Sequence, residues 1–343
     1  MNMSKKRVTR EDVAKLAGVS TATVSYVLNK SIKVKPSTQE KVLSAVKELD
    51  YRPDPIARSM VTKQTMQLSI VLNNIANPIY SDMILGFEKQ ALEKGYFVNI
   101  CTGQSNIDEY FDDFVSRRID GVFIEALPEK YHIEKVYKLV DAGIKVIMFG
   151  HGGVDLRKVS SVENDYIYTL EKAVEHLWGL GHREIAYLSG LSEDQGYDLR
   201  VQGYKKAMER LTASTSHELC LCSPGVTNTD IADGRRMAHS LLESGKPFSA
   251  VITTNDLMAI GAMQQFQESG FSVPDDVSVL GIDGASFGEI VTPRLTTMKS
   301  DYYQIGAKAF ELLFNSIKED TKGFYQNHPH LVVRGSTAKK RER

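Results

Sequence analysis

Six residues stand where an apolar run ends or a helical stretch opens, and open parallel sheets bind small molecules at such places. A carboxylate ends DGVFIEA, an amide ends AVITTN and a second carboxylate ends VSVLGID. A planar guanidinium opposite a carboxylate and an amide suits a ligand with adjacent hydroxyls or a carboxylate. The residues predicted to line this site are Ile79, Tyr80, Glu125, Arg200, Asn255 and Asp283.

Some of these side chains also have a purely structural explanation. Asp283 can cap a helix, and Arg200 can form a surface ion pair. Glu125 can accept a hydrogen bond from a neutral hydroxyl or pair with a cationic ligand. Their convergence at the ends of several strands favours a binding site, and the sequence leaves the identity of its ligand open.

One catalytic pattern fits superficially. Gly284 to Gly288 match G-x-S-x-G, which in hydrolases places a nucleophilic serine between a strand and a helix. Thr292 and Pro293 interrupt the chain a few residues later, so no strong helix can follow Ser286. Neither G-x-x-x-x-G-K-[ST] nor G-x-G-x-x-G is present. The sequence therefore predicts no catalytic residue and a protein that is not an enzyme.

The stretch VTREDVAKLAGVSTATVSYVLN, residues 8–29, predicts two short helices joined by a tight turn. Thr9 can cap the first helix together with Asp12, and Gly18 can close it in a left-handed conformation. Ser20 can cap the second helix. The outer face of that second helix is small and polar, as a DNA major groove requires, and consists of Thr21, Ala22, Ser25, Tyr26 and Asn29.

A third helix is expected to begin with a capping box from Ser37 to Glu40 and to end near Tyr51. Charge favours a nucleic-acid partner for this region. Residues 1–62 hold 12 Lys and Arg against 6 Asp and Glu, whereas the whole chain has a net charge of −1. Such an asymmetry indicates a polyanion at the N-terminal region.

Residues 51–62 predict a short helix that forms only against a partner. Asp54 can cap it and Pro55 suits its first turn. Isolated helices need roughly 12 to 15 residues to be stable in water, and this one is shorter. The segment RPDPIARSM, with the helices before it and the body beyond it, resembles the LacI/GalR family of bacterial repressors along essentially the full chain.

The resemblance implies that the segment is a hinge helix in the DNA minor groove, with Met60 at the position of the intercalating side chain, which is usually Leu. Met is apolar and unbranched, so it can still separate a base step. Tyr26 stands where many members have Arg, and Tyr cannot pair with guanine in the bidentate way. The predicted DNA contacts are Thr9, Ser20, Thr21, Ala22, Ser25, Tyr26, Asn29, Lys33, Thr38, Asp54, Ala57 and Met60.

From Gln67 onward, eight apolar runs alternate with helical stretches, which predicts parallel sheets in two lobes with a cleft between them. The resemblance implies the two-lobed α/β fold of type I periplasmic binding proteins after an all-α helix-turn-helix headpiece. The predicted parts are a headpiece (1–52), a hinge and linker (53–65), an effector-binding domain (66–335) and a charged tail (336–343). Its first lobe is predicted over 66–161 and 297–322, and its second over 164–292 and 330–335.

Composition favours a soluble cytoplasmic protein. Hydrophobic residues make up 42% and charged residues 25%, no apolar run reaches 18 residues, and no apolar stretch follows the basic N-terminus as in a signal peptide. Cys101, Cys220 and Cys222 lie in apolar runs and are expected to be buried free thiols. The Cys-x-Cys pair has no third ligand nearby, so we expect neither a metal nor a cofactor.

By resemblance, Arg200, Asn255 and Asp283 match the recurring effector contacts of the family, and Tyr80 matches an aromatic residue that lies against the ligand. Glu125 departs from one branch, which has a neutral amide there. The sequence thus predicts a transcriptional regulator, most simply a repressor, that binds palindromic operator DNA as a homodimer. A sugar or related metabolite is the expected effector, and a solute-binding protein without a DNA role is the alternative.

Overall fold

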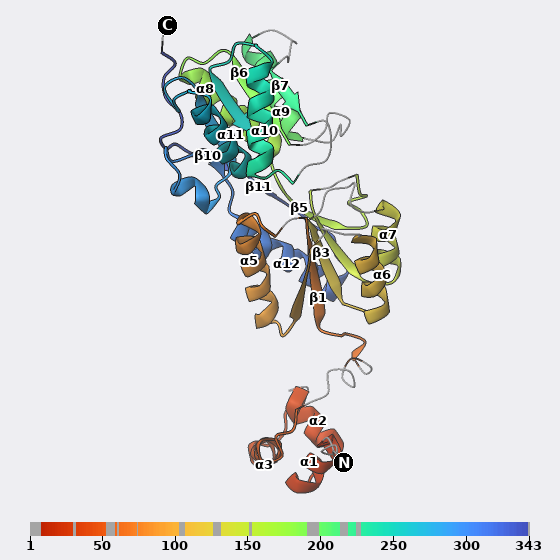
Figure 1. Cartoon of the computed structure of the whole chain (residues 1–343). Coiled ribbons are helices and arrows are strands. Elements are labelled where there is room, and N and C mark those ends of the chain that lie inside the picture. The colour runs from red at the N-terminus through yellow and green to blue at the C-terminus, as the bar shows by residue number, and fades with distance from the viewer. Residues whose placement is uncertain are drawn as a thin grey trace, which may run out of the picture. The chain divides into compact units, whose positions relative to one another are not determined.

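The computed structural model describes residues 8–29, 32–52, 59, 62–73, 75–102, 107–125, 132–150, 153–190, 199–212, 219–223 and 228–341. The chain forms two compact units, residues 1–65 and 66–343 (Figure 1). Asp54, Ala57 and Met60, which were predicted to contact the minor groove, lie outside the described residues.

The first unit contains the three predicted helices, α1 (Arg10–Ala17), α2 (Thr21–Asn29) and α3 (Pro36–Glu48). Thr9 and Asp12 form the predicted capping box, with 2.8 Å from the Thr9 amide to an Asp12 carboxylate oxygen. Gly18 ends α1 with a φ of 65°, and the Thr23 amide donates to Ser20 Oγ over 3.1 Å at the start of α2. The core that joins the helices consists of Val13, Ala14, Val24, Val42, Ala45 and Tyr51.

The predicted capping box at the start of α3 is wrong. The helix begins at Pro36, its N-cap is Lys35, and no side chain caps it. Proline suits the first position of a helix because its φ is already helical and its missing N–H would have no partner there. The helix therefore begins two residues earlier than the Ser37 pattern indicates.

The second unit contains two six-stranded sheets. The first has the order β11-β5-β4-β3-β1-β2 and is entirely parallel. Helices α5 (Ile79–Glu93) and α12 (Tyr302–Glu319) cover one face, while α6 (Ile107–Arg117) and α7 (Ile133–Asp141) cover the other (Figure 1). The strands are β1 (Gln67–Leu72), β2 (Phe97–Thr102), β3 (Gly121–Glu125), β4 (Lys145–Phe149), β5 (Ser160–Asn164) and β11 (Phe324–Asn327).

The second sheet has the order β12-β10-β9-β8-β6-β7, and only β12 runs antiparallel to its neighbour. One face packs on α8 (Tyr166–Gly179) and α9 (Leu199–Thr212), the other on α10 (Ile231–Glu243) and α11 (Asp256–Glu268). The strands are β6 (Ile185–Ser189), β7 (Cys220–Cys222), β8 (Ala250–Thr253), β9 (Ser278–Asp283), β10 (Thr296–Lys299) and β12 (His330–Val332).

Each sheet with its helices forms one lobe. The chain passes between the two lobes at three crossovers, after β5, β10 and β11. The predicted lobe ranges place the end of β5 and most of β10 in the wrong lobe and leave β11 outside both. The first sheet contains all of β5 and β11, and the second contains β10. Four strands, β5, β10, β11 and β12, were not predicted. Their sequences SSVEN, TTMK, FYQN and HLV are short, and none contains more than two consecutive apolar residues, so no apolar run marks them.

The packed part of the second lobe continues past residue 335, where the tail was predicted to begin. Ser336 is fully buried, and its hydroxyl donates to the Val279 carbonyl over 2.6 Å. The Ala338 amide donates to Ser278 Oγ over 3.1 Å. Hydrogen bonding to β9 therefore orders residues that look like a charged tail in the sequence.

The three cysteines are free, as predicted, but they are half-buried rather than buried. Two of them lie in β7 and one in β2, and both strands are at the edge of a sheet. Among the described residues, no helix is long and apolar enough to span a membrane, and no cluster of three or more metal-ligating side chains is found.

Candidate functional site

The outer face of α2 carries the side chains predicted to read DNA. Thr21, Ala22 and Tyr26 are exposed and Ser25 is half-buried, while Val24 faces the core. The side chain of Asn29 lies outside the described part of the structure. The helix therefore presents small polar groups and one aromatic ring to solvent, a surface that fits a major groove.

The other predicted DNA contacts of the headpiece lie at the ends of its helices. Thr9 and Ser20 are cap residues, so their hydroxyls already have partners in Asp12 and Thr23. Lys33 is exposed, and Thr38 is half-buried in the first turn of α3. An exposed lysine beside the start of a helix suits a phosphate contact.

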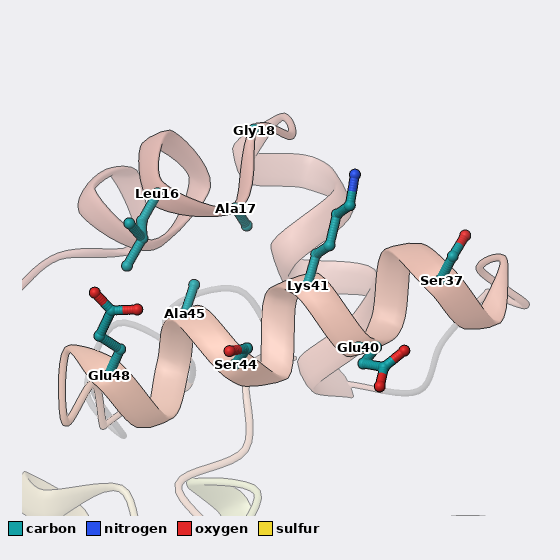
Figure 2. Close-up of a pocket in the computed structure, with 9 residues that line it drawn as sticks. All are labelled: Leu16, Ala17, Gly18, Ser37, Glu40, Lys41, Ser44, Ala45 and Glu48. Carbon is teal, nitrogen blue, oxygen red and sulfur yellow. The ribbon is translucent and has the colours of Figure 1, made fainter.

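A separate groove of about 640 Å³ lies between the end of α1 and the length of α3 (Figure 2). No residue of α2 lines this groove. Its charged side chains are Glu40, Lys41 and Glu48, so acidic groups outnumber basic ones. The groove is therefore unsuited to DNA phosphates.

A second cavity, of about 70 Å³, lies between the two lobes of the body. All six residues predicted for the small-molecule site line it. The remaining lining residues come from both lobes and from the crossovers. They are Asn73, Asn77, Met83, Phe149, Tyr166, Thr229, Thr254 and Tyr302.

Asp283 lies at the centre of the polar contacts of this cavity. It ends β9 with a φ of 115°, a conformation that is costly for any residue except glycine. Its Oδ1 accepts a hydrogen bond of 2.6 Å from the Tyr302 hydroxyl, and the Asn77 side chain also hydrogen-bonds to it. Asp283 is therefore not a helix cap, and it joins the second lobe to two residues of the first.

Burial raises the pKa of Asp283 to about 7, although Tyr302 and Arg200 favour its charged form. Burial also raises the pKa of Glu125, against the hydrogen bonds from Tyr80 and from the Asn73 amide. Glu125 adds to the rise at Asp283 because the two charges repel. The cavity thus holds two carboxylates whose charges are poorly compensated in the ligand-free protein.

Arg200 lies over the ring of Tyr166, with 4.5 Å from the guanidinium carbon to the ring centroid. Its charge lowers the pKa of both Glu125 and Asp283. Arg200 thus lines the cavity against an aromatic face. This position allows the guanidinium to face a bound molecule.

Asn255 has largely structural contacts. Its Oδ1 caps α11 by accepting from the Met258 amide over 2.9 Å, and its Nδ2 donates to the Thr229 carbonyl over 2.8 Å. The remaining N–H of the amide is the atom available to a ligand. Asn255 therefore positions the segment before α10 as much as it lines the cavity.

A network of buried hydrogen bonds connects the cavity with all three crossovers. Asn164 Oδ1 accepts from Ser300 Oγ over 3.1 Å and from Asn327 Nδ2 over 2.7 Å. Asn164 Nδ2 donates to the Tyr302 hydroxyl over 3.4 Å, and that hydroxyl donates to Asp283. Asp283 is therefore hydrogen-bonded, through Tyr302 and Asn164, to the crossover segments between the lobes.

Ser286, in the G-x-S-x-G pattern, begins a short 3₁₀ helix, η2 (Ser286–Glu289), and is exposed. It does not stand on the sharp turn from strand to α-helix that exposes a hydrolase nucleophile.

Comparisons with known proteins agree with this geometry. Residues 9–54 match the family described as "Bacterial regulatory proteins, lacI family". Residues 174–337 match the family described as "Periplasmic binding protein-like domain". The chain is 33% identical over 340 residues to the HTH-type transcriptional repressor PurR of Vibrio vulnificus, covering 96% of this chain and 99% of that protein. The chain belongs to the lacI family of bacterial regulatory proteins. It is a DNA-binding transcriptional regulator and not an enzyme.

Solved structures of lacI-family regulators extend the likeness to the whole fold. A lac repressor dimer bound to operator and an anti-inducer has a TM-score of 0.82 and 26% identity, covering 97% of this chain and 100% of that chain. A complex of the transcriptional regulator CelR with cellobiose has a TM-score of 0.72 and 29% identity over 96% of this chain and 100% of that chain. The predicted family resemblance and fold class are thereby confirmed.

Sequence reasoning missed several residues of the cavity. Asn73 follows the apolar run of β1 and could have been found by the strand-end rule that found Asp283. Tyr302 could not, because the preceding strand, β10, has no apolar run to mark its end. Phe149 and Tyr166 look like ordinary core aromatics in the sequence.

Proposed function

We propose that this member of the lacI family is a repressor that binds a palindromic operator as a homodimer, and that a small molecule in the interlobe cavity controls its affinity for DNA. The observation that carries the proposal is the hydrogen-bonded connection from Asp283, through Tyr302, to Asn164 at the crossovers. A ligand that binds Asp283 has different binding free energies in two arrangements of the lobes. Such a difference shifts the equilibrium between those arrangements.

The DNA-reading residues in this proposal are the exposed ones of α2, supported by Lys33 and Thr38 at the start of α3 and by the hinge contacts Asp54, Ala57 and Met60. The effector-binding residues are Ile79, Tyr80, Glu125, Arg200, Asn255 and Asp283. A bacterial protein that binds operator DNA acts in the cytoplasm, so the proposal includes a cytoplasmic location.

Two exposed apolar surfaces on the body support a dimer. On the first lobe, Phe97 and Ile100 of the edge strand β2 are 66% and 46% exposed, and Leu92 of α5 is 71% exposed. On the second lobe, Ile290 is 77% and Phe287 is 43% exposed. An unpaired edge strand with apolar side chains is a ready site for association, and a twofold dimer would cover both surfaces.

The proposed repressor function is tested by selecting a binding site from random duplex DNA with the full chain. The affinity for that site is then measured as a function of salt concentration. A dimer that neutralises roughly 6 to 10 phosphates has a log-log slope of about −5 to −9. A palindromic selected site and a slope in that range support the proposal. A protein that selects no sequence, or whose affinity does not depend on salt, contradicts it.

A further inference from the structure

The interlobe cavity is rich in hydrogen-bond acceptors. The carboxylates of Glu125 and Asp283 reach it from opposite lobes, and Asn73, which follows the neighbouring strand β1, also lines it. The Asn73 side chain carries one further acceptor, Oδ1. This Asn73 oxygen is buried and has no hydrogen-bond partner among the described residues. A buried acceptor without a hydrogen-bond partner destabilises the protein, so this oxygen favours a ligand that carries a donor.

Two tyrosine hydroxyls that line the cavity already donate to its carboxylates. The Tyr302 hydroxyl donates to Asp283, and the Tyr80 hydroxyl to Glu125. Among the described lining residues, Arg200 is the only basic one, and it faces both carboxylates. With both carboxylates ionised, the lining therefore carries one negative charge in excess.

The walls of the cavity are aromatic and the space is small. Tyr80, Phe149, Tyr166 and Tyr302 line it, and aromatic faces attract organic cations. The cavity has a volume of about 70 Å³.

We propose that the effector is a small amino polyol, of which an amino sugar is the simplest kind, with its ammonium group between Glu125 and Asp283 and a hydroxyl donating to Asn73 Oδ1. This inference rests on the proposed function, because it names the ligand class of the same site. An ammonium group supplies three donors and the positive charge that the lining lacks. A carboxylate-bearing ligand would add a third negative charge, and a neutral sugar would leave the excess charge uncompensated.

Glu125 determines this selectivity more than Asp283 does. Asp283 already has the Tyr302 hydroxyl and the Asn77 side chain as partners, and burial keeps its pKa near neutrality. Glu125 accepts hydrogen bonds from the Asn73 backbone amide over 3.3 Å and from the Tyr80 hydroxyl. It ends β3 beside Asn73, whose side-chain oxygen has no hydrogen-bond partner among the described residues. Replacing its carboxylate with an amide removes the charge and retains the shape.

The experiment is calorimetric titration of the full chain with matched sugars: glucosamine and galactosamine, their neutral parents glucose and galactose, the N-acetyl forms, and glucuronate. We expect only the free amines to bind, and Glu125→Gln to weaken that binding roughly tenfold to a hundredfold, as expected for a charge-assisted hydrogen bond. Glu134→Gln, an exposed glutamate of α7, is the matched control and should leave binding unchanged.

Three outcomes overturn the inference: a neutral or acidic sugar that binds as well as its amine, no amine-specific binding at millimolar concentrations, or Glu125→Gln with wild-type affinity for amines. Operator titration of the ligand-free protein separates this failure from that of the proposed function. A protein that binds its operator and responds only to a neutral or acidic ligand remains a regulator with a different effector. A protein that binds glucosamine but selects no DNA retains the cavity chemistry and loses the regulatory role.

Discussion

Asp283→Asn should stabilise the ligand-free protein above neutral pH. The ordinary pKa of an aspartate is 3.8, and burial raises that of Asp283 to about 7. Between these values the folded protein holds a proton that the unfolded chain has lost, so the free energy of unfolding falls as pH rises. A difference of about 3 units corresponds to about 4 kcal/mol, of which roughly 2 to 3 kcal/mol is lost between pH 5 and 7.

The asparagine variant avoids this loss and retains the geometry. Its amide oxygen can still accept the hydroxyl of Tyr302, and asparagine tolerates positive φ better than most residues, as the φ of 115° requires. The charged and titratable groups around the position, Glu125, Arg200, Tyr302 and the buried Asp256, stay in place.

The assay is urea unfolding of both proteins without ligand at pH 5, 6, 7 and 8. The wild type should lose stability relative to Asp283→Asn as pH rises to 7, and the difference should then stay constant. Asp141→Asn, at an exposed position at the end of α7, should follow the wild type at every pH. Parallel curves for the wild type and Asp283→Asn would refute the reasoning, because they would mean that the carboxylate is ionised at no cost.

Three further outcomes are expected. Gly306→Ala should lower the free energy of unfolding by about 1 to 3 kcal/mol, because its Cβ would lie 2.0 Å from the Met83 carbonyl where α12 crosses α5, whereas Gly179→Ala meets no atom within 4 Å; equal urea midpoints would contradict this. Asn164→Ala should lower it by roughly 2 to 4 kcal/mol, more than Asn327→Ala, because Asn164 has three buried hydrogen bonds to the other crossovers; unfolding curves of both variants decide. Calorimetric affinity for an amine effector should rise between pH 5 and 7, where the ammonium group stays protonated and its charge favours the ionised form of Asp283; a flat profile would contradict the pairing.

The sequence predicted those elements whose local pattern is strong. The capping box of α1 and the turn at Gly18 involve residues close in sequence, and they form as expected. The apolar runs that end at Glu125 and Asp283 are central strands buried on both faces, which is why they stand out. The crossover strands were missed because SSVEN and TTMK owe their pairing to long-range contacts rather than to their own composition.

The candidate site shows the same contrast between local sequence patterns and long-range contacts. Strand-end reasoning located six residues that the fold brings to one cavity. It could not show that Asn255 is engaged in capping α11, or that Tyr302 joins Asp283 to the crossovers, since both depend on contacts between the chain's distant parts. The unpartnered oxygen of Asn73, from which the charge preference of the cavity is partly inferred, is likewise a property of the packed structure.

The central claim is that the interlobe cavity controls DNA binding, and one measurement tests it most directly: operator titrations with and without the effector, on wild type, Arg200→Ala and the exposed control Arg294→Ala. We expect Arg200→Ala to bind operator normally without ligand and to lose the response to ligand, since a charge-assisted contact contributes about 1.5 to 3 kcal/mol to the coupling. Arg294→Ala should respond as the wild type does. A full ligand response in Arg200→Ala would contradict the claim and place the effector elsewhere.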